Sequence, residues 1–291
     1  MPVPPPLLVV DAPFLLYRSF FALPDSIRGA DGQPVNALLG AVNNLLRIAA
    51  DVSPRAVVIC FGAESAPYRV QLYPGYHAQR PPMPAQLRRQ FEQAPALFEA
   101  LGWQVESSEE LEADDLLGAF AREESAAGGV TLILTGDRDM YQCVSASVGV
   151  LYLKQGTAGF EIVDRAEVLR RYGIEPELVP DFIALRGDPS DGIPGAPGIG
   201  EKTAAQLLRR HGSLEATIAG AAAERPRVAL ALTEHADALR AYREIALLRP
   251  VRVTRPPDTA TDLSGGAAAA SALGMGALAG RLEQAATLAE L

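Results

Sequence analysis

The sequence predicts an α/β protein in which a mainly parallel β-sheet, flanked by helices on both faces, is followed by a helical module. Short β-branched, apolar runs alternate with helix-periodic segments over the first half of the chain, which favours the sheet. A loop dense in glycine, proline and aspartate at 188–200 is followed by helical patterns up to about residue 248, which favours the module. Acidic residues end two of the predicted strands, so we expect the functional site beyond the carboxyl edge of the sheet.

The individual elements follow from the spacing of apolar residues. Strands are expected at 7–11, 56–61, 103–106, 131–135 and 148–153, and helices at 35–50, 112–125 and 201–210. Residues 65–91 contain five prolines, four arginines and no acidic residue, so we expect a long, basic, irregular segment with a functional role. The Ala/Gly-rich tail from residue 256 is expected to form one or two small helices around 267–291.

Composition excludes several classes of protein. The 291 residues are 48% hydrophobic, enough for one large domain or a large and a small one. Two cysteines argue against a disulfide scaffold or a cysteine zinc site. The start has no basic segment of the kind that opens a signal peptide, and no apolar run approaches the ~20 residues of a membrane helix. We therefore expect a soluble cytoplasmic protein without membrane association.

The formal net charge of −9 argues against a nucleic-acid partner, but its distribution does not. Residues 106–124 hold eight acidic residues against one arginine. Residues 198–252 hold nine Lys and Arg against six Asp and Glu, a net of 9 − 6 = +3. The pattern predicts basic surfaces on either side of an acidic centre.

Carboxylates gather at strand ends, at one helix start and in the glycine-rich loop. Like charges brought close together raise one another's pKa or require a cation. Oxygen ligands with a phosphate substrate suit Mg²⁺ or Mn²⁺, and the three histidines are too scattered for a zinc site. The candidate metal ligands are Asp11, Glu112, Asp114, Asp115, Asp137, Asp139, Asp188 and Asp191.

A Gly-x-Gly-x-Lys-Thr sequence opens the helix expected at 201–210. Gly198 and Gly200 allow backbone N–H groups to turn towards an anion, and Lys202 adds a charge. The spacing is not that of a P-loop. A plain helix start is the alternative, but the flanking helices favour a helix–hairpin–helix clamp that grips the nucleic-acid backbone without reading bases.

Together these motifs resemble the bacterial 5′-nuclease/flap endonuclease family, which includes stand-alone 5′→3′ exonucleases and the amino-terminal domain of some DNA polymerases. The resemblance covers residues 7–248 and follows the family's motif order. It rests on the sequences LVVD at 8–11, YPGYHAQR at 73–80, EADD at 112–115, TGDRDMYQ at 135–142, GDPSDGIPG at 187–195 and GIGEKTA at 198–204.

The resemblance implies three parts of the chain. Residues 1–175 would form a PIN-like nuclease domain with a basic helical arch or clamp near 65–91. Residues 176–252 would form a helix–hairpin–helix (H3TH) module, and 253–291 an Ala/Gly-rich extension with no attached polymerase domain. The implied protein is monomeric, lies with the nucleoid, acts on DNA with 5′ ends or 5′ flaps, and works beside a polymerase or ligase.

The implied activity is divalent-metal-dependent 5′→3′ exonuclease and 5′-flap endonuclease cleavage of DNA phosphodiesters. The eight carboxylates would hold Mg²⁺ or Mn²⁺, and His77 and Arg80 would be catalytic. Backbone carbonyls of Pro197 and Ile199 would hold K⁺. DNA would be bound by Tyr17, Arg18, Gly198, Ile199, Gly200, Lys202 and Thr203, although core packing is an alternative role for Tyr17.

Two positions depart from the family pattern. Gly62 stands where the family has an aspartate that binds one of two metals, which weakens the second metal site unless Glu64 replaces it. His77 stands where the family has a lysine in the arch. Three other functions remain open: a non-catalytic DNA-junction binder, a PIN-type ribonuclease, and a dehalogenase-like phosphatase, whose usual Asp-x-Asp is absent at Asp11.

Overall fold

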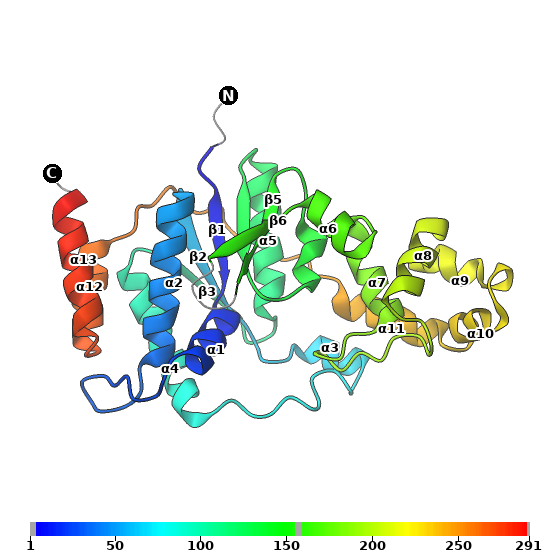
Figure 1. Cartoon of the computed structure of the whole chain (residues 1–291), viewed down its shortest axis with the longest axis horizontal. Coiled ribbons are helices and arrows are strands. Elements are labelled where there is room, and N and C mark those ends of the chain that lie inside the picture. The colour runs from blue at the N-terminus through cyan, green and yellow to red at the C-terminus, as the bar shows by residue number, and fades with distance from the viewer. Residues whose placement is uncertain (1–3, 155–158, 290–291) are drawn as a thin grey trace.

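A computed structural model describes residues 4–154 and 159–289, and it contains one six-stranded sheet in the order β3-β2-β1-β4-β5-β6 (Figure 1). The strands are β1 (Leu7–Asp11), β2 (Ala56–Phe61), β3 (Gln104–Ser107), β4 (Thr131–Leu134), β5 (Val148–Leu153) and β6 (Phe160–Val163). Neighbouring strands from β3 to β5 pair in parallel. The predicted parallel sheet is confirmed. The antiparallel edge strand β6 was not predicted, because it has only four residues and exposes Ile162.

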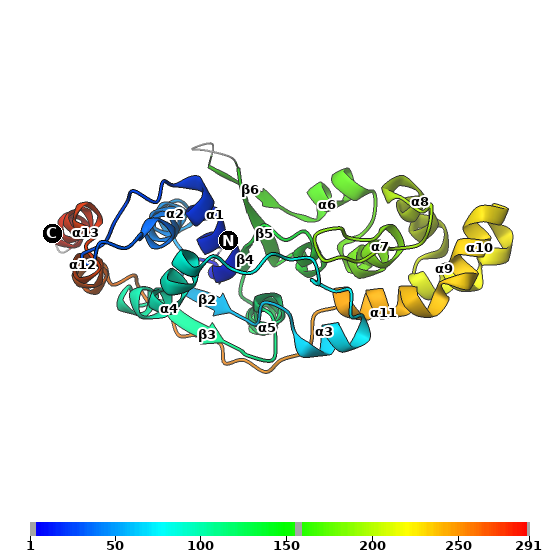
Figure 2. The same ribbon diagram turned by 90° about the horizontal axis from the view of Figure 1, so that it is seen from below.

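Both faces of the sheet are buried, as the continuous apolar strands require. Side chains alternate between the faces, so that Leu8 and Val10 of β1 enter one core while Leu7 and Val9 enter the other. Figure 2 shows α1, α2 and α4 on one side of the sheet and α5 on the other. No helix in the described part of the chain is long and apolar enough to cross a membrane.

The helices of the sheet domain are α1 (Ala12–Ala22), α2 (Asn36–Val52), α3 (Pro67–Leu72), α4 (Ala85–Ala100), α5 (Ala113–Ala126) and α6 (Arg165–Tyr172). Helix α1 was not predicted. It begins at once after β1 because Asp11 caps it, accepting a hydrogen bond of 2.9 Å from the Phe14 amide. Pro13 adds a fixed φ in the first turn.

The basic segment 65–91 is more regular than expected. Helix α3 begins at Pro67 and α4 begins after Pro84, since proline is well tolerated in a first helical turn. Only residues 65–66 and 73–84 of the segment lie outside a helix. In Figure 1 the stretch 73–84 runs along the lower edge of the molecule between α4 and α3.

The helical module comprises α7 (Val179–Arg186), α8 (Glu201–His211), α9 (Leu214–Ala219), α10 (Pro226–Glu234) and α11 (Ala236–Ala246). Short 3₁₀ turns lie at Asp139–Cys143, Pro176–Leu178 and Ala221–Ala223. The loop from α7 to α8 folds back on itself at two glycines: a Cβ on Gly195 would lie 2.3 Å from the Gly187 nitrogen, and both residues have positive φ. Only glycine fits this turn.

The tail returns to the sheet domain and ends in α12 (Leu263–Ala272) and α13 (Gly276–Ala289), which lie at the opposite end of the molecule from the helical module (Figure 1). The prediction of one or two helices there is confirmed, although the first begins four residues early. Glu124, with 1% of its side chain exposed, pairs with both Arg55 and Arg255, which ties the returning chain to α5.

Candidate active site

The carboxylates of Asp11, Asp114, Asp137 and Asp139, here called the acidic centre, come together at the carboxyl edge of the sheet. Asp11 ends β1, and Asp137 and Asp139 follow β4, its parallel neighbour. Asp114 lies in the first turn of α5, where the helix dipole favours an acid. Thr135 joins the two strand ends, because its hydroxyl donates to Asp11 Oδ2 at 2.7 Å and accepts from the Asp137 amide at 3.0 Å.

Burial raises the pKa of every carboxyl group in the acidic centre, and repulsion between carboxylates adds to the rise for Asp114, Asp137 and Asp139. Burial is the largest cause for each of them. The pKa of Asp137 rises to about 7, with the charge of Asp191 as a further cause. The pKa values of Asp114 and Asp139 rise well above the ordinary value, partly through the charge of Asp137. The folded chain therefore concentrates negative charge that a cation would relieve.

The donor set fits a hard divalent cation in part. All candidate ligands are carboxylate oxygens, which Mg²⁺ and Mn²⁺ prefer. Among the described residues, no group of three or more His, Cys, Asp or Glu side chains is arranged so that it could hold a metal ion. Mg²⁺ usually keeps several waters and takes further ligands from substrate phosphate, so a partial set of carboxylates suffices.

The raised pKa of Asp137 makes a prediction about the chelator-treated protein. Its carboxyl binds a proton in the folded state up to pH 7 but in the unfolded state only up to about 3.8. The stabilising effect of this proton is therefore complete below about pH 4 and is lost as the pH rises through 7. We expect the Tm in chelator to fall between pH 5.5 and 8, and Mn²⁺ to restore it at pH 8. A thermal unfolding series measures this.

Asp137→Asn is the matched variant, because the amide cannot titrate. Its Tm should depend less on pH over the same range and respond less to Mn²⁺. An unchanged pH dependence of the Tm in this variant would contradict the attribution of that dependence to Asp137.

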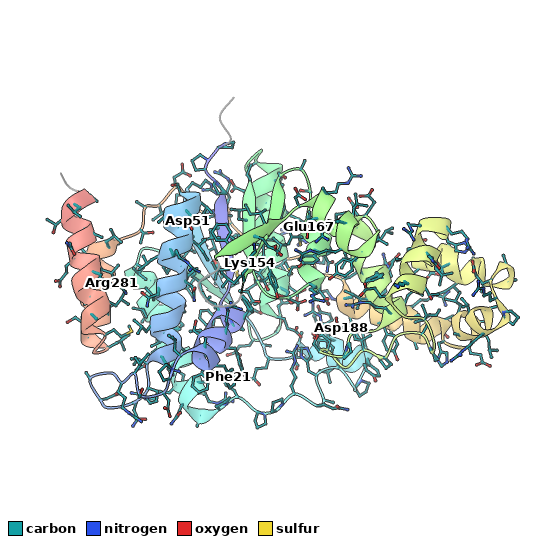
Figure 3. The ribbon with its side chains drawn as sticks, viewed as in Figure 1. Phe21, Asp51, Lys154, Glu167, Asp188 and Arg281 are labelled. Carbon is teal, nitrogen blue, oxygen red and sulfur yellow. The ribbon has the colours of Figure 1, made fainter. Side chains whose placement is uncertain are left out.

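The two loop aspartates differ in their contacts. Asp191 Oδ1 lies 2.9 Å from Arg80 Nη2 and 3.2 Å from His77 Nε2, and the charge of Asp191 reaches Asp137 and Asp139. Asp188, labelled in Figure 3, accepts from the Ser190 amide at 2.9 Å and pairs with Arg186 at 3.1 Å. The charge of Asp188 also acts on Asp137 and Asp139, but Asp191 is the larger cause for each, so Asp191 is the better placed of the two to join the acidic centre.

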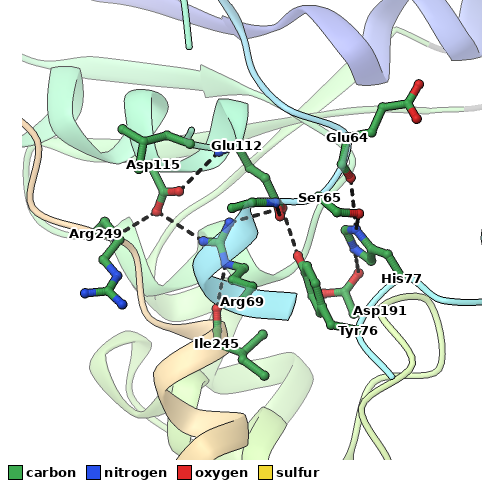
Figure 4. Close-up of polar contacts among 12 residues, drawn as sticks. Glu64, Ser65, Arg69, Tyr76, His77, Glu112, Asp115, Asp191, Ile245 and Arg249 are labelled. Carbon is green, nitrogen blue, oxygen red and sulfur yellow. Dashed lines mark hydrogen bonds and ion pairs between the residues drawn. The ribbon is translucent and has the colours of Figure 1, made fainter. Parts of the chain in front are cut away.

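Asp115 and Glu112 belong to a different, buried network (Figure 4). Arg69 places one guanidinium nitrogen 3.1 Å from Asp115 Oδ1 and another 3.1 Å from Glu112 Oε2. Asp115 also accepts from the Arg249 amide at 2.7 Å, and Glu112 from the Tyr76 hydroxyl at 2.8 Å. These contacts do not support the prediction that both residues are metal ligands, since their oxygens already face donors.

The network could be anticipated only in part. Both acids stand in the EADD sequence at 112–115. Glu112 and Asp115 form a capping box at the start of α5. Their partner Arg69 was counted only as one of several basic residues in 65–91. Arg69 also donates to the Ile245 carbonyl at 2.9 Å, so a single buried side chain joins α3, α5 and α11.

Gly62 has no room for a side chain. A Cβ there would lie 2.2 Å from the Ala113 nitrogen, in the backbone where α5 begins. Glu64 does not replace the missing carboxylate, since 60% of its side chain is exposed and its nearest cation, Arg88, is 3.9 Å away.

The residues predicted to contact DNA lie on two elements. Tyr17 of α1 packs against Phe91 of α4 and Phe21 of α1, and Phe21 is 72% exposed at the end of its helix (Figure 3). Arg18 donates to the Lys154 carbonyl. The residues of the predicted clamp form the turn before α8, where Gly198 has φ 79° and Ile199 is buried, and the first turn of α8, where Lys202 is exposed.

A mainly parallel sheet with an acidic edge, followed by a helical module, is the arrangement of exonucleases with a resolvase-like domain. Two family models match the chain: the 5′-3′ exonuclease N-terminal resolvase-like domain over residues 6–173 and the 5′-3′ exonuclease C-terminal SAM fold over 174–260. The chain belongs to the 5′-3′ exonuclease family.

Relatives agree with this assignment. A 5′-3′ exonuclease of Streptomyces coelicolor is 37% identical over 284 residues, which cover 91% of this chain and 93% of the relative. DNA polymerase I of Mycobacterium bovis is 36% identical over 257 residues, 88% of this chain but only 28% of the polymerase. Among solved structures, the T5 5′-exonuclease with bound zinc shares the fold at TM-score 0.68 and 17% identity, covering 96% of this chain and 97% of that one. The catalytic core of Rad2 with DNA does so at TM-score 0.64 and 15% identity, covering 96% and 90%.

Proposed function

We propose that the protein is a structure-specific, divalent-metal-dependent nuclease that hydrolyses phosphodiesters of DNA with 5′ ends or 5′ flaps. The observation that carries the proposal is the buried acidic centre, whose charge is unbalanced without a cation and beside which Arg80 stands half exposed. The S. coelicolor relative is named a 5′-3′ exonuclease and matches this chain over 93% of its own length, which supports the activity. The comparison with T5 5′-exonuclease supports divalent metal use.

Asp114, Asp137, Asp139 and Asp191 would hold the better-equipped metal site, directly or through water. Mg²⁺ or Mn²⁺ would lower the pKa of the attacking water and neutralise charge on the phosphate. A second site would depend on Asp11, and it is weak because Gly62 supplies no carboxylate and Glu112 is held by Arg69.

Arg80 is the residue we assign to the reacting phosphate. Its guanidinium faces Asp191 from a side chain that is 49% exposed, so a phosphate can reach it. Its charge also acts on Asp11 across the acidic centre. Donors placed where charge develops on the phosphate stabilise the transition state.

The turn before α8 would bind the DNA backbone away from the cleaved bond. Gly200 caps α8 without a side-chain hydrogen bond, which leaves the amides of the first turn available to a phosphate. The carbonyls of Pro197 and Ile199 accept no hydrogen bond from the residues that the structure describes, which suits the proposed K⁺ site. Thr203 lies half-buried beside Lys202 in the first turn of α8.

Lys202→Gln is expected to weaken flap-DNA binding several-fold while leaving the cleavage rate at saturating DNA nearly unchanged. The slope of log K against log salt should fall by about 1, because one phosphate contact is lost. Titrations at several salt concentrations measure both. Arg281→Gln on α13 is the control. An equal loss of DNA affinity in that variant would contradict the proposal that Lys202 belongs to a DNA-binding clamp.

The function itself is tested by incubating matched 5′-flap substrates with Mn²⁺, Mg²⁺ or chelator. We expect metal-dependent cleavage of the DNA flap. Binding without cleavage in any metal would show a DNA-junction binder instead, and preferential cleavage of the RNA flap would show a ribonuclease. We further propose that the protein acts as a monomer with the chromosome in the cytoplasm, near a polymerase or ligase, as the polymerase I relatives suggest.

A further inference from the structure

His77 is enclosed on both edges of its ring. Its side chain is 3% exposed, and its Nε2 lies 3.2 Å from Asp191 Oδ1. Its Nδ1 lies 2.9 Å from Ser65 Oγ and 3.0 Å from the Glu64 carbonyl oxygen. Its backbone amide donates to the Asp191 carbonyl at 3.0 Å, so His77 contacts the loop between α7 and α8 through both ring and backbone, while its ring also contacts the segment that follows β2 (Figure 4).

The ring is also held in place by its neighbours. It stacks on Tyr76 with ring centres 3.7 Å apart, and the Tyr76 hydroxyl in turn donates a hydrogen bond to Glu112. The backbone of His77 has φ 55°, a left-handed conformation that a non-glycine residue adopts mainly where its surroundings impose it. A ring fixed in this way is not free to follow a phosphate.

Asp191 is bound on one oxygen only. Oδ1 receives both Arg80 and His77, whereas Oδ2 accepts no hydrogen bond within the described ranges. The two donors differ in access to solvent: Arg80 is 49% exposed and can turn to a substrate, but His77 cannot. When Arg80 leaves, His77 remains the donor that orients the carboxylate.

We propose that His77 is a positioning residue, which holds Asp191 so that its second oxygen faces the acidic centre, and that it does not itself contact the reacting phosphate. The proposal replaces the catalytic role expected from the sequence, and it rests on the proposed nuclease function. Hydrogen bonds to a metal-ligating carboxylate typically matter 10–100-fold in metal affinity or activity. Either the imidazolium or the neutral ring with its hydrogen on Nε2 can make this donation.

Two substitutions separate the contacts of the ring. His77→Asn tolerates the left-handed backbone and keeps an amide where Nδ1 lies, but it is too short to reach Asp191. His77→Gln extends an amide to the place of Nε2 and can still donate to Asp191. His235→Asn, at the junction of α10 and α11, is the matched control.

The experiment measures the Mn²⁺ concentration that gives half-maximal cleavage of a 5′-flap DNA, together with the Mn²⁺-dependent rise in Tm without DNA. For His77→Asn we expect both midpoints to increase about 10-fold or more, with the rate at saturating Mn²⁺ close to that of the wild type. His77→Gln should stay within about threefold of wild-type midpoints, and His235→Asn should match them. Tm values in chelator confirm that each variant folds.

A lower rate at saturating Mn²⁺ with unchanged midpoints in His77→Asn would overturn the proposal and restore a direct catalytic role. Wild-type midpoints together with a wild-type rate would also overturn it. If the wild-type protein cuts no DNA at all, the proposed function fails, and the Mn²⁺-dependent Tm rise still decides the role of His77.

Discussion

Asp139→Asn is expected to lower the rate of flap-DNA cleavage by about 10³-fold or more, because metal stabilisation of the transition state is worth several kcal/mol and each 1.4 kcal/mol is tenfold. Asp139 is 8% exposed, and the charges of Asp137 and Asp191 both act on it. Single-turnover cleavage at saturating DNA and Mn²⁺ measures the effect on chemistry.

The same variant separates loss of activity from loss of fold. Burial and neighbouring carboxylates disfavour the charge of Asp139, so the neutral amide should leave the chelator-treated protein at least as stable as the wild type. Its DNA affinity should persist, since the clamp at Lys202 is untouched. Asp237→Asn, with a fully exposed side chain, is the control and should cleave normally. Substantial cleavage by Asp139→Asn would remove this residue from the metal site.

Arg69→Met is expected to destabilise the folded protein by about 3–5 kcal/mol, the usual cost of leaving a buried charge without its partner. Arg69 is 3% exposed and pairs with both Glu112 and Asp115, and Asp115 is completely buried. Its loss would also release the Ile245 carbonyl and so loosen the helical module from α3. Urea unfolding measures the change.

Neutralising the abandoned partner should recover part of this loss. In Arg69→Met/Asp115→Asn, one uncompensated charge is gone, so the double variant should be more stable than the sum of the single losses predicts. Arg240→Met removes an exposed arginine of the helical module that pairs with Glu215, and it should change stability little. Equal effects of the two arginine substitutions on the free energy of unfolding would show that burial does not increase the contribution of the Arg69 ion pairs to stability.

The sheet was predictable because β1, β2, β4 and β5 are largely apolar runs that alternate with helix-periodic segments. Leu8 and Val10 face one core and Leu7 and Val9 the other, which is why this strand shows no polar alternation. Helix α1 was missed although its signals, an aspartate cap and a proline in the first turn, stand in the sequence. The segment 65–91 is more regular than its composition predicts, because two of its five prolines stand where helices begin.

By itself, the sequence determined the order of the strands along the chain, the carboxylates at their ends and the glycine-rich turn before α8, since each depends on neighbouring residues. The tertiary structure decided what those carboxylates do. Asp114 and Asp115 are adjacent, yet one faces other acids and the other faces Arg69 and the Arg249 amide, which are 46 and 134 positions away. His77 likewise meets Asp191 across 114 positions. Charges are paired through space, so only the folded chain could separate the candidate metal ligands from the buried ion pairs.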